Sequence, residues 1–166
     1  MIKAEDRNKV RIIELPACKM VWSGVCKDGS NVAENERLKH FNEWWTAQDK
    51  LRRDLFYARD FMWHDSEANG LAWGLAVAEI PKGTSGYEVM DFPGGLYAVV
   101  NYADNDAEGA YKNIKKWVEE SGCFAPDDSA SRHFLWHFIS TEAVKTAMGY
   151  YQYDFYFPIK IKEEAE

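Results

Sequence analysis

The side chains best suited to chemistry in this sequence are aromatic rings on predicted strands. Such rings can line a slot for a flat apolar guest, and the face of an indole attracts a cation through its quadrupole. One carboxylate, Glu79, lies in an apolar stretch, and turned inward it would invite a cationic ligand to compensate its buried charge. The set predicted to bind a ligand is Trp22, Trp63, Trp73, Glu79, Tyr97, Trp136 and Tyr156.

Two other interpretations of these residues stay open at the sequence level. The rings can pack in an ordinary core, and Glu79 can be exposed at a strand end. No catalytic or cofactor motif is present, because the sequence lacks GxSxG, HExxH, a P-loop and GxGxxG. His64 and His137 follow similar aromatic strings and could form a symmetric metal pair, but neither has a carboxylate or cysteine pattern beside it. We therefore predict no catalytic residue, no metal and no cofactor.

The elements that must position these rings occur twice. Residues 10–81 and 87–158 both read as strand, helix, strand, strand, and residues 82–86 link the two copies. A duplicated unit of this kind builds one domain with a pseudo-two-fold axis, and a cleft is expected where the copies meet. The residues that anchor the match are Glu14 with Asp91, Pro16 with Pro93, Phe61–His64 with Phe134–His137, and Ile80-Pro81 with Phe157-Pro158.

Periodicity and turn residues place the individual elements. A long amphipathic helix begins at a capping box of Asn31 and Glu34 and ends near Asp54, and a second begins at 105 or 106 and ends at Gly122. Strands are predicted at 10–26, 56–64, 71–80, 87–103, 132–139 and 150–161, with a turn of helix at 141–148 and a disordered tail at 162–166. The predicted fold is α+β, with two tandem βαββ modules whose antiparallel sheets are each covered by one long helix. The other face of each sheet must meet the partner sheet or a ligand.

Length and charge narrow the function classes. A chain of 166 residues fits a single domain over 1–166, and a net charge of -7 disfavours direct nucleic-acid binding, although an acidic surface also serves solubility alone. Three cysteines without CxxC spacing indicate reduced thiols and a cytoplasmic protein. No apolar stretch is long enough to span a bilayer, so neither export nor membrane insertion is expected.

Three segments form a familiar pattern: residues 91–100, which read DFPGGLYAVV, the helix that carries Trp117 and ends at Gly122, and residues 153–160, which read YDFYFPIK. Together they resemble the GyrI-like small-molecule-binding family, which is also the effector-binding domain of bacterial AraC-type and MerR-type multidrug regulators. The resemblance covers about residues 8–162. It implies two SHS2 modules in tandem with a ligand in the groove between them. It also implies that Trp22, Tyr97 and Tyr156 match the family's pocket rings.

The resemblance implies a binder of hydrophobic, aromatic, often cationic small molecules, either alone or as the sensing part of a transcription regulator with a DNA-binding domain. Two alternatives follow from other members: a hydrolase that opens cyclopropane-bearing toxins, and a protein-interaction module that inhibits DNA gyrase. One departure concerns charge. Where the family often carries an acid on the penultimate strand, this chain reads Trp136-His137-Phe138, so a preference for neutral guests is equally compatible.

Overall fold

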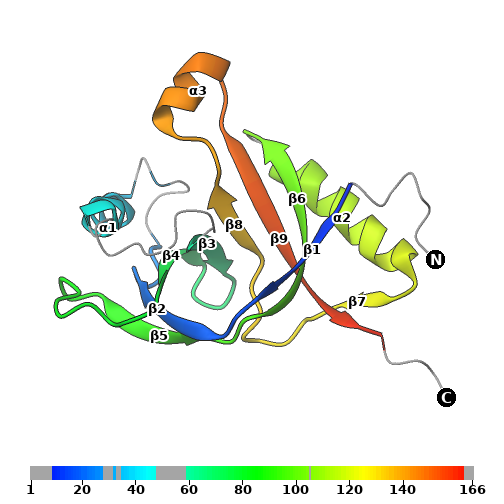
Figure 1. Ribbon diagram of the computed structural model, residues 1–166, viewed down its shortest axis with the longest axis horizontal. Coiled ribbons are helices and arrows are strands. Elements are labelled where there is room, and N and C mark those ends of the chain that lie inside the picture. Colours follow the sequence, from blue (N-terminus) through cyan, green and yellow to red (C-terminus); the bar gives the residue numbers. More distant parts are fainter. Residues whose placement is uncertain (1–8, 28–31, 33–34, 48–58, 105, 163–166) are drawn as a thin grey trace. The chain divides into compact units, whose positions relative to one another are not determined.

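The computed structural model describes residues 9–27, 32, 35–47, 59–104 and 106–162. Within these ranges the chain is a mixture of antiparallel strands and three helices, so the predicted α+β class is confirmed (Figure 1). It divides into two compact units. Unit 1 comprises Met1–Pro16 and Pro93–Glu166, and unit 2 comprises Ala17–Phe92.

Unit 1 is built on an antiparallel sheet in which β9 is central. The strand order is β1 (Arg11–Leu15), β6 (Gly95–Ala103), β9 (Gln152–Ile161) and β8 (Leu135–Phe138), and β7 (Phe124–Pro126) pairs with the last residues of β9. Helix α2 (Ala107–Ser121) packs against β6, β7 and β9, and the short α3 (Glu142–Met148) precedes β9 (Figure 1). The sequence indicated no strand at β7.

Unit 2 repeats the same arrangement with fewer residues. Its strand order is β5 (Glu88–Phe92), β2 (Cys18–Trp22), β4 (Gly70–Val77) and β3 (Asp60–Asp65), again antiparallel throughout. Helix α1 (Glu36–Ala47) contacts β4. Because β1, β6, β9 and β8 correspond to β5, β2, β4 and β3, the two sheets have the same strand order, as a duplicated βαββ unit requires.

The compact units do not coincide with the two sequence copies. Each copy begins with a long predicted strand that breaks at a proline, Pro16 in the first copy and Pro93 in the second. The arm before the break pairs within the unit formed mainly by the other copy, so that β1 pairs with β6 and β5 pairs with β2. Proline lacks a backbone N–H, which suits it to the point where the strand leaves one sheet for the other.

The registers of these two exchanged pairs are identical. Leu15 lies opposite Gly95 in the β1–β6 ladder, and Phe92 lies opposite Cys18 in the β5–β2 ladder. Position 15 thus corresponds to position 92, and position 18 to position 95, each 77 residues further along the chain. The 77-residue spacing seen in the sequence is therefore the spacing of structurally corresponding residues in this part of the chain.

The match of the last strands is wrong. Met20 lies opposite Ala76, and its counterpart Tyr97 lies opposite Pro158. Pro158 therefore corresponds to Ala76, whereas Pro81, its predicted counterpart, lies beyond the end of β4. The segments that join the paired strands differ in length between the copies, so one spacing cannot hold along the whole repeat.

The match of the two aromatic strings is also wrong, by one residue. Trp63 lies opposite Ala72, and His137 lies opposite Asp154. Ala76 corresponds to Pro158, so Ala72 and Asp154, which lie four residues earlier in β4 and β9, also correspond. Their ladder partners Trp63 and His137 therefore correspond as well, and Trp63 does not correspond to Trp136. Because side chains alternate along a strand, a slip of one residue exchanges the two faces of the sheet.

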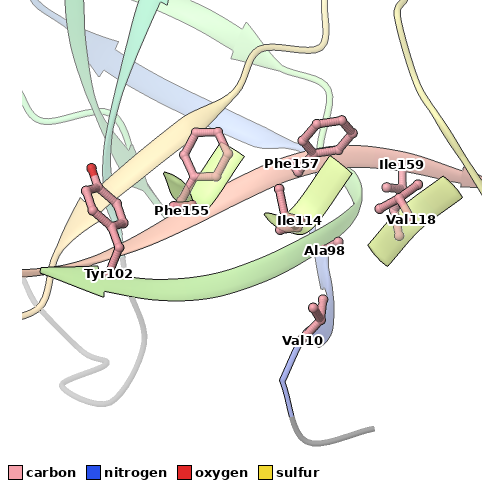
Figure 2. Close-up of a cluster of buried hydrophobic side chains, with 9 residues drawn as sticks. Val10, Ala98, Tyr102, Ile114, Val118, Phe155, Phe157 and Ile159 are labelled. Atoms are coloured by element: carbon pink, nitrogen blue, oxygen red, sulfur yellow. The ribbon is translucent and has the colours of Figure 1, made fainter. Parts of the chain in front are cut away.

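The core of unit 1 lies between α2 and its sheet. Ala110, Ile114 and Val118 of α2 are buried, as the helical periodicity predicts, and Trp117 is partly buried beside them. Figure 2 shows Ile114 and Val118 together with the side chains of β9 that they meet, including Phe157 and Ile159. The helix ends at Gly122, which adopts a left-handed conformation with φ 76°, as predicted.

Helix α1 begins later than its sequence suggests. Asn35 caps it, because the Asn35 Oδ1 accepts a hydrogen bond from the backbone N–H of Leu38 at 3.0 Å. Leu38 and Phe41 are its buried residues. The predicted cap residues Asn31 and Glu34 and the predicted end near Asp54 lie outside the described residues, as does most of the predicted tail. No helix in the described ranges is both long and apolar enough to cross a membrane.

Candidate ligand-binding surfaces

Each sheet has one face against its helix and a second face opposite, which we call the helix-distal face. In unit 2 this face carries two stacked indoles. Trp22 of β2 and Trp63 of β3 have ring centroids 6.0 Å apart and planes inclined by 15°. Gly74 lies between them on β4, and a Cβ there would lie 3.0 Å from Trp63. Trp63 is buried and Trp22 half-buried, so the stack has an accessible edge.

The rest of this surface is apolar and polarizable. Phe61 and Phe92 stack in parallel with centroids 6.4 Å apart, and Met20 is fully buried next to Gly74. These residues share the helix-distal face with the two indoles, because directly opposed residues of a ladder point to the same side. A face of indole, phenyl and thioether groups suits a flat hydrophobic guest.

The corresponding face of unit 1 is more polar. Tyr97 of β6 and Tyr156 of β9 form an edge-to-face pair with centroids 6.0 Å apart. Tyr97 has no exposed surface, and its hydroxyl has no hydrogen-bond partner among the described residues. Burial raises the pKa of Tyr97 to about 12, although the charge of Arg132 opposes that rise. The hydroxyl therefore stays protonated at neutral pH and is a hydrogen-bond donor with no acceptor in the described part of the chain.

Arg132 stacks on the ring of Tyr97. Its guanidinium carbon lies 4.3 Å from the ring centroid, and its Nη2 donates a hydrogen bond to the carbonyl oxygen of Leu96 at 2.6 Å. Its Nε lies 3.3 Å from Asp127 Oδ2 as an ion-pair contact without the geometry of a hydrogen bond. Gly95 makes the approach possible, since a Cβ at that position would lie 2.0 Å from Arg132 Nη1.

Asp127 is held ionised beside this arginine. Partial burial raises the pKa of its carboxyl, but hydrogen bonds from Ser129 and the charge of Arg132 outweigh burial and lower that pKa overall. Arg132 and Asp127 thus form a neutral pair next to Tyr97.

A buried carboxylate on this face escaped the sequence analysis. Asp154 of β9 lies directly opposite His137 of β8 and two residues from Tyr156, and only 7% of it is exposed. Its Oδ1 lies 2.5 Å from an Nη2 of Arg11, a side chain that is about half-exposed. The signal that would have revealed it is the step Asp154-Phe155-Tyr156, because residues two apart on a strand share a face. An acid therefore lies on β9 directly opposite His137, although the segment Trp136-His137-Phe138 itself contains none.

Two of the predicted rings lie on the helix-covered faces instead. Trp73 packs against Phe41 of α1, and its Nε1 donates a hydrogen bond to Asp60 Oδ2 at 3.2 Å. Trp136 packs edge-to-face on Phe155 and joins the cluster under α2. These placements favour core packing, and a ligand-binding role for either residue stays a prediction.

Glu79 lies two residues past the end of β4 and is exposed. Its role in binding also stays a prediction, as does the expected groove between the two modules. The rings that share helix-distal faces are Trp22 with Trp63 in unit 2, and Tyr97 with Tyr156 in unit 1.

No family model matches the sequence, and the comparison with curated proteins found no match. Solved structures of similar fold do exist. The C-terminal domain of EcmrR superposes with a TM-score of 0.62 at 16% identity, over 92% of this chain and 97% of that one. EcmrR in its DNA complex gives 0.63 at 16% identity, over 92% of this chain and 57% of the longer EcmrR chain.

Two further proteins share the fold. A hydrolase from Listeria innocua gives a TM-score of 0.59 at 14% identity, over 92% of both chains. SAV2435 bound to tetraphenylphosphonium gives 0.51 at 11% identity, over 92% of this chain and 94% of that one. At these identities the likeness shows the fold alone, and it is consistent with the GyrI-like fold that the sequence implied.

Proposed function

We propose that this protein binds hydrophobic aromatic small molecules on the helix-distal faces of its sheets. The observation that carries the proposal is the stack of Trp22 on Trp63, in which a half-buried indole offers an accessible edge next to a buried one. A guest ring that packs beside them gains apolar burial and aromatic contact, and such contacts contribute about 0.5 to 1.5 kcal/mol beyond area burial. Support also comes from SAV2435, a protein of the same fold whose structure contains tetraphenylphosphonium.

The test compares two tryptophan variants in a panel of aromatic guests, read by thermal shift and by isothermal titration calorimetry. Trp22→Leu should weaken binding about tenfold or more, since it removes a ring from the proposed surface. Trp117→Leu is the matched control, because Trp117 is also half-buried but packs on Phe124 at the helix side of unit 1. Equal losses in both variants would show that Trp22 does not contact the guest.

The proposed role in a cell is that of a sensor. The EcmrR complex with DNA supports this role, because the fold there belongs to a longer chain that meets DNA. We propose that an associated DNA-binding domain, rather than this acidic chain, contacts nucleic acid. Gel-shift titration of the full gene product, with and without a bound aromatic guest, tests it: a guest-dependent change in DNA affinity supports the sensor. Inhibition of DNA gyrase is the remaining alternative, and a supercoiling assay tests it separately.

A second function, hydrolysis, is favoured by one specific observation. Asp154 and His137 are directly opposed on the helix-distal face, with Tyr156 two residues away on the same side. A carboxylate beside an imidazole can orient it as a general base that takes a proton from water as the water oxygen bonds to a strained ring carbon. The ring C–C bond to that carbon breaks, the released electron pair passes into the substrate, and the proton returns to it from the imidazolium. Asp154→Asn should then abolish turnover of a cyclopropane-bearing substrate while it leaves binding within about threefold. Equal turnover by the wild type and by buffer rejects this alternative.

A further inference from the structure

We propose that the Tyr97 site takes a neutral aromatic guest that bears a hydrogen-bond acceptor oxygen, such as a carbonyl or phosphoryl group, and that it discriminates against lipophilic cations. This inference rests on the proposed binding function and names the chemical class of its ligand. It follows from the hydrogen-bond donors and charges around one ring.

Two buried donors next to each other lack an acceptor. The Tyr97 hydroxyl and the Arg132 Nε–H are both buried, and neither has a hydrogen-bond partner among the described residues. The guanidinium that carries the second donor stacks directly on the ring that carries the first, so both belong to one cluster. Leaving a buried donor unpaired costs its desolvation free energy, and a guest oxygen that accepts from either group recovers part of that cost.

The two features that would attract a cation are already occupied. A guest cation seeks an aromatic face or a carboxylate. Arg132 covers the face of Tyr97 and also lies 3.3 Å from Asp127, the carboxylate whose charge acts on Tyr97. A lipophilic cation at Tyr97 must therefore displace the guanidinium of Arg132.

A full negative charge on the guest is not required either. Arg132 lies against Asp127, and these are the two charges that act on Tyr97, so they compensate each other beside the ring. What the Tyr97 hydroxyl and the Arg132 Nε–H lack among the described residues is a hydrogen-bond acceptor, not an opposite charge. A neutral acceptor oxygen supplies this without burying an unpaired ion.

Entry of the guest involves the Arg132 side chain. Tyr97 has no exposed surface, so a guest reaches its hydroxyl only when the covering side chains shift. We expect Arg132 to move, because it is a long side chain whose contacts with the described residues are a hydrogen bond to Leu96, an ion-pair contact to Asp127 and the stack on Tyr97. Its Nε–H can follow the guest and donate to the same oxygen.

The experiment uses two guests of nearly identical shape. Triphenylphosphine oxide and methyltriphenylphosphonium both carry three phenyl rings, but the first has a neutral P=O acceptor where the second has a methyl group and a positive charge. By titration calorimetry we expect the wild type to bind the oxide about tenfold tighter or more. Tyr97→Phe should weaken the affinity for the oxide roughly five- to tenfold and leave the affinity for the phosphonium unchanged.

Two further variants sharpen the result. Tyr102→Phe is the matched control, because Tyr102 is a buried tyrosine of the same strand that lies on the α2 side, and it should change neither affinity. Arg132→Met should reduce the ratio of the affinity for the oxide to that for the phosphonium, because it uncovers the Tyr97 ring for a cation. Circular dichroism and the thermal midpoint establish that each variant is folded before its affinity is compared.

Failure of this inference can be told apart from failure of the proposed function. If the phosphonium binds the wild type as tightly as the oxide, or if Tyr97→Phe weakens both guests equally, the acceptor proposal is wrong while aromatic binding stands. If no aromatic guest binds the wild type, both are wrong.

Discussion

Gly95 and Arg132 are in such close contact that an added Cβ on Gly95 would lie 2.0 Å from Arg132 Nη1. Gly95 also has φ 110°, a conformation that L residues rarely adopt. The glycine that follows the break at Pro93 thus serves two purposes, since it turns the chain into β6 and leaves room for the guanidinium over Tyr97.

Gly95→Ala should therefore destabilise the protein by about 2 to 4 kcal/mol, of which roughly 1 to 3 comes from backbone strain and the rest from displacing Arg132. Urea denaturation measures the loss. Gly86→Ala is the control, because Gly86 has φ 82° but nothing within 4 Å of its Cβ position. A loss no larger than that of the control would show that the contact with Arg132 contributes nothing.

Gly74 has a similar relationship to the stacked indoles of unit 2. A Cβ at Gly74 would lie 3.0 Å from Trp63 and 3.1 Å from the sulfur of Met20. Gly74→Ala should overpack this face, cost about 1 to 3 kcal/mol, and disturb the Trp22–Trp63 stack, which near-ultraviolet circular dichroism reports. Gly83→Ala, where nothing lies within 4 Å, should leave both signals essentially unchanged. An unaltered aromatic spectrum in Gly74→Ala would contradict this packing.

The pair of Arg11 and Asp154 predicts a measurable coupling between the exchanged strand β1 and β9. The Oδ1 of Asp154 is buried and lies 2.5 Å from Arg11, whose side chain is 56% exposed. Solvent screens the exposed partner, so the coupling energy in a double-mutant cycle of Arg11→Met and Asp154→Asn should be only about 1 kcal/mol. Arg11→Met alone should cost more than Asp154→Asn alone, because it leaves a buried carboxylate uncompensated. Additive losses would contradict a direct interaction.

The sequence predicted that the two arms correspond, although not that each pairs in the unit formed mainly by the other copy. Pro16 and Pro93 stand at the two breaks, and the 77-residue spacing between them equals the spacing of corresponding ladder residues. Gly122 likewise predicted the end of α2, since a left-handed C-cap favours glycine. These are local signals, and each depends on one residue and its backbone.

The sequence could not predict which rings share a face, because that depends on register. The strings around Trp63 and Trp136 look alike, yet the ladders pair Trp63 with Ala72 and Trp136 with Phe155, which places the two indoles on opposite kinds of face. The missed carboxylate has the same cause. In the sequence nothing distinguishes Asp154 from the other acidic residues, because only the register of β9 with β8 places it opposite His137.

The buried hydroxyl of Tyr97 predicts a specific alkaline effect on stability. Burial raises its pKa to about 12, whereas an exposed tyrosine in the unfolded chain loses its proton near pH 10. Between these values the unfolded state binds fewer protons than the folded state, so stability falls as the pH rises from about 10 to about 12. The Tyr97 titration leaves the free energy of unfolding unchanged below pH 10. By pH 12 it lowers that free energy by about 2 to 3 kcal/mol.

Tyr97→Phe removes this titration. Below pH 10 the variant should be as stable as the wild type or slightly more stable, because the hydroxyl it removes has no hydrogen-bond partner among the described residues. The difference in unfolding free energy between the two proteins should then grow in favour of the variant as the pH approaches 12. Urea denaturation at a series of pH values gives the two curves, and parallel curves between pH 10 and 12 would mean that the Tyr97 hydroxyl is not buried in the folded protein.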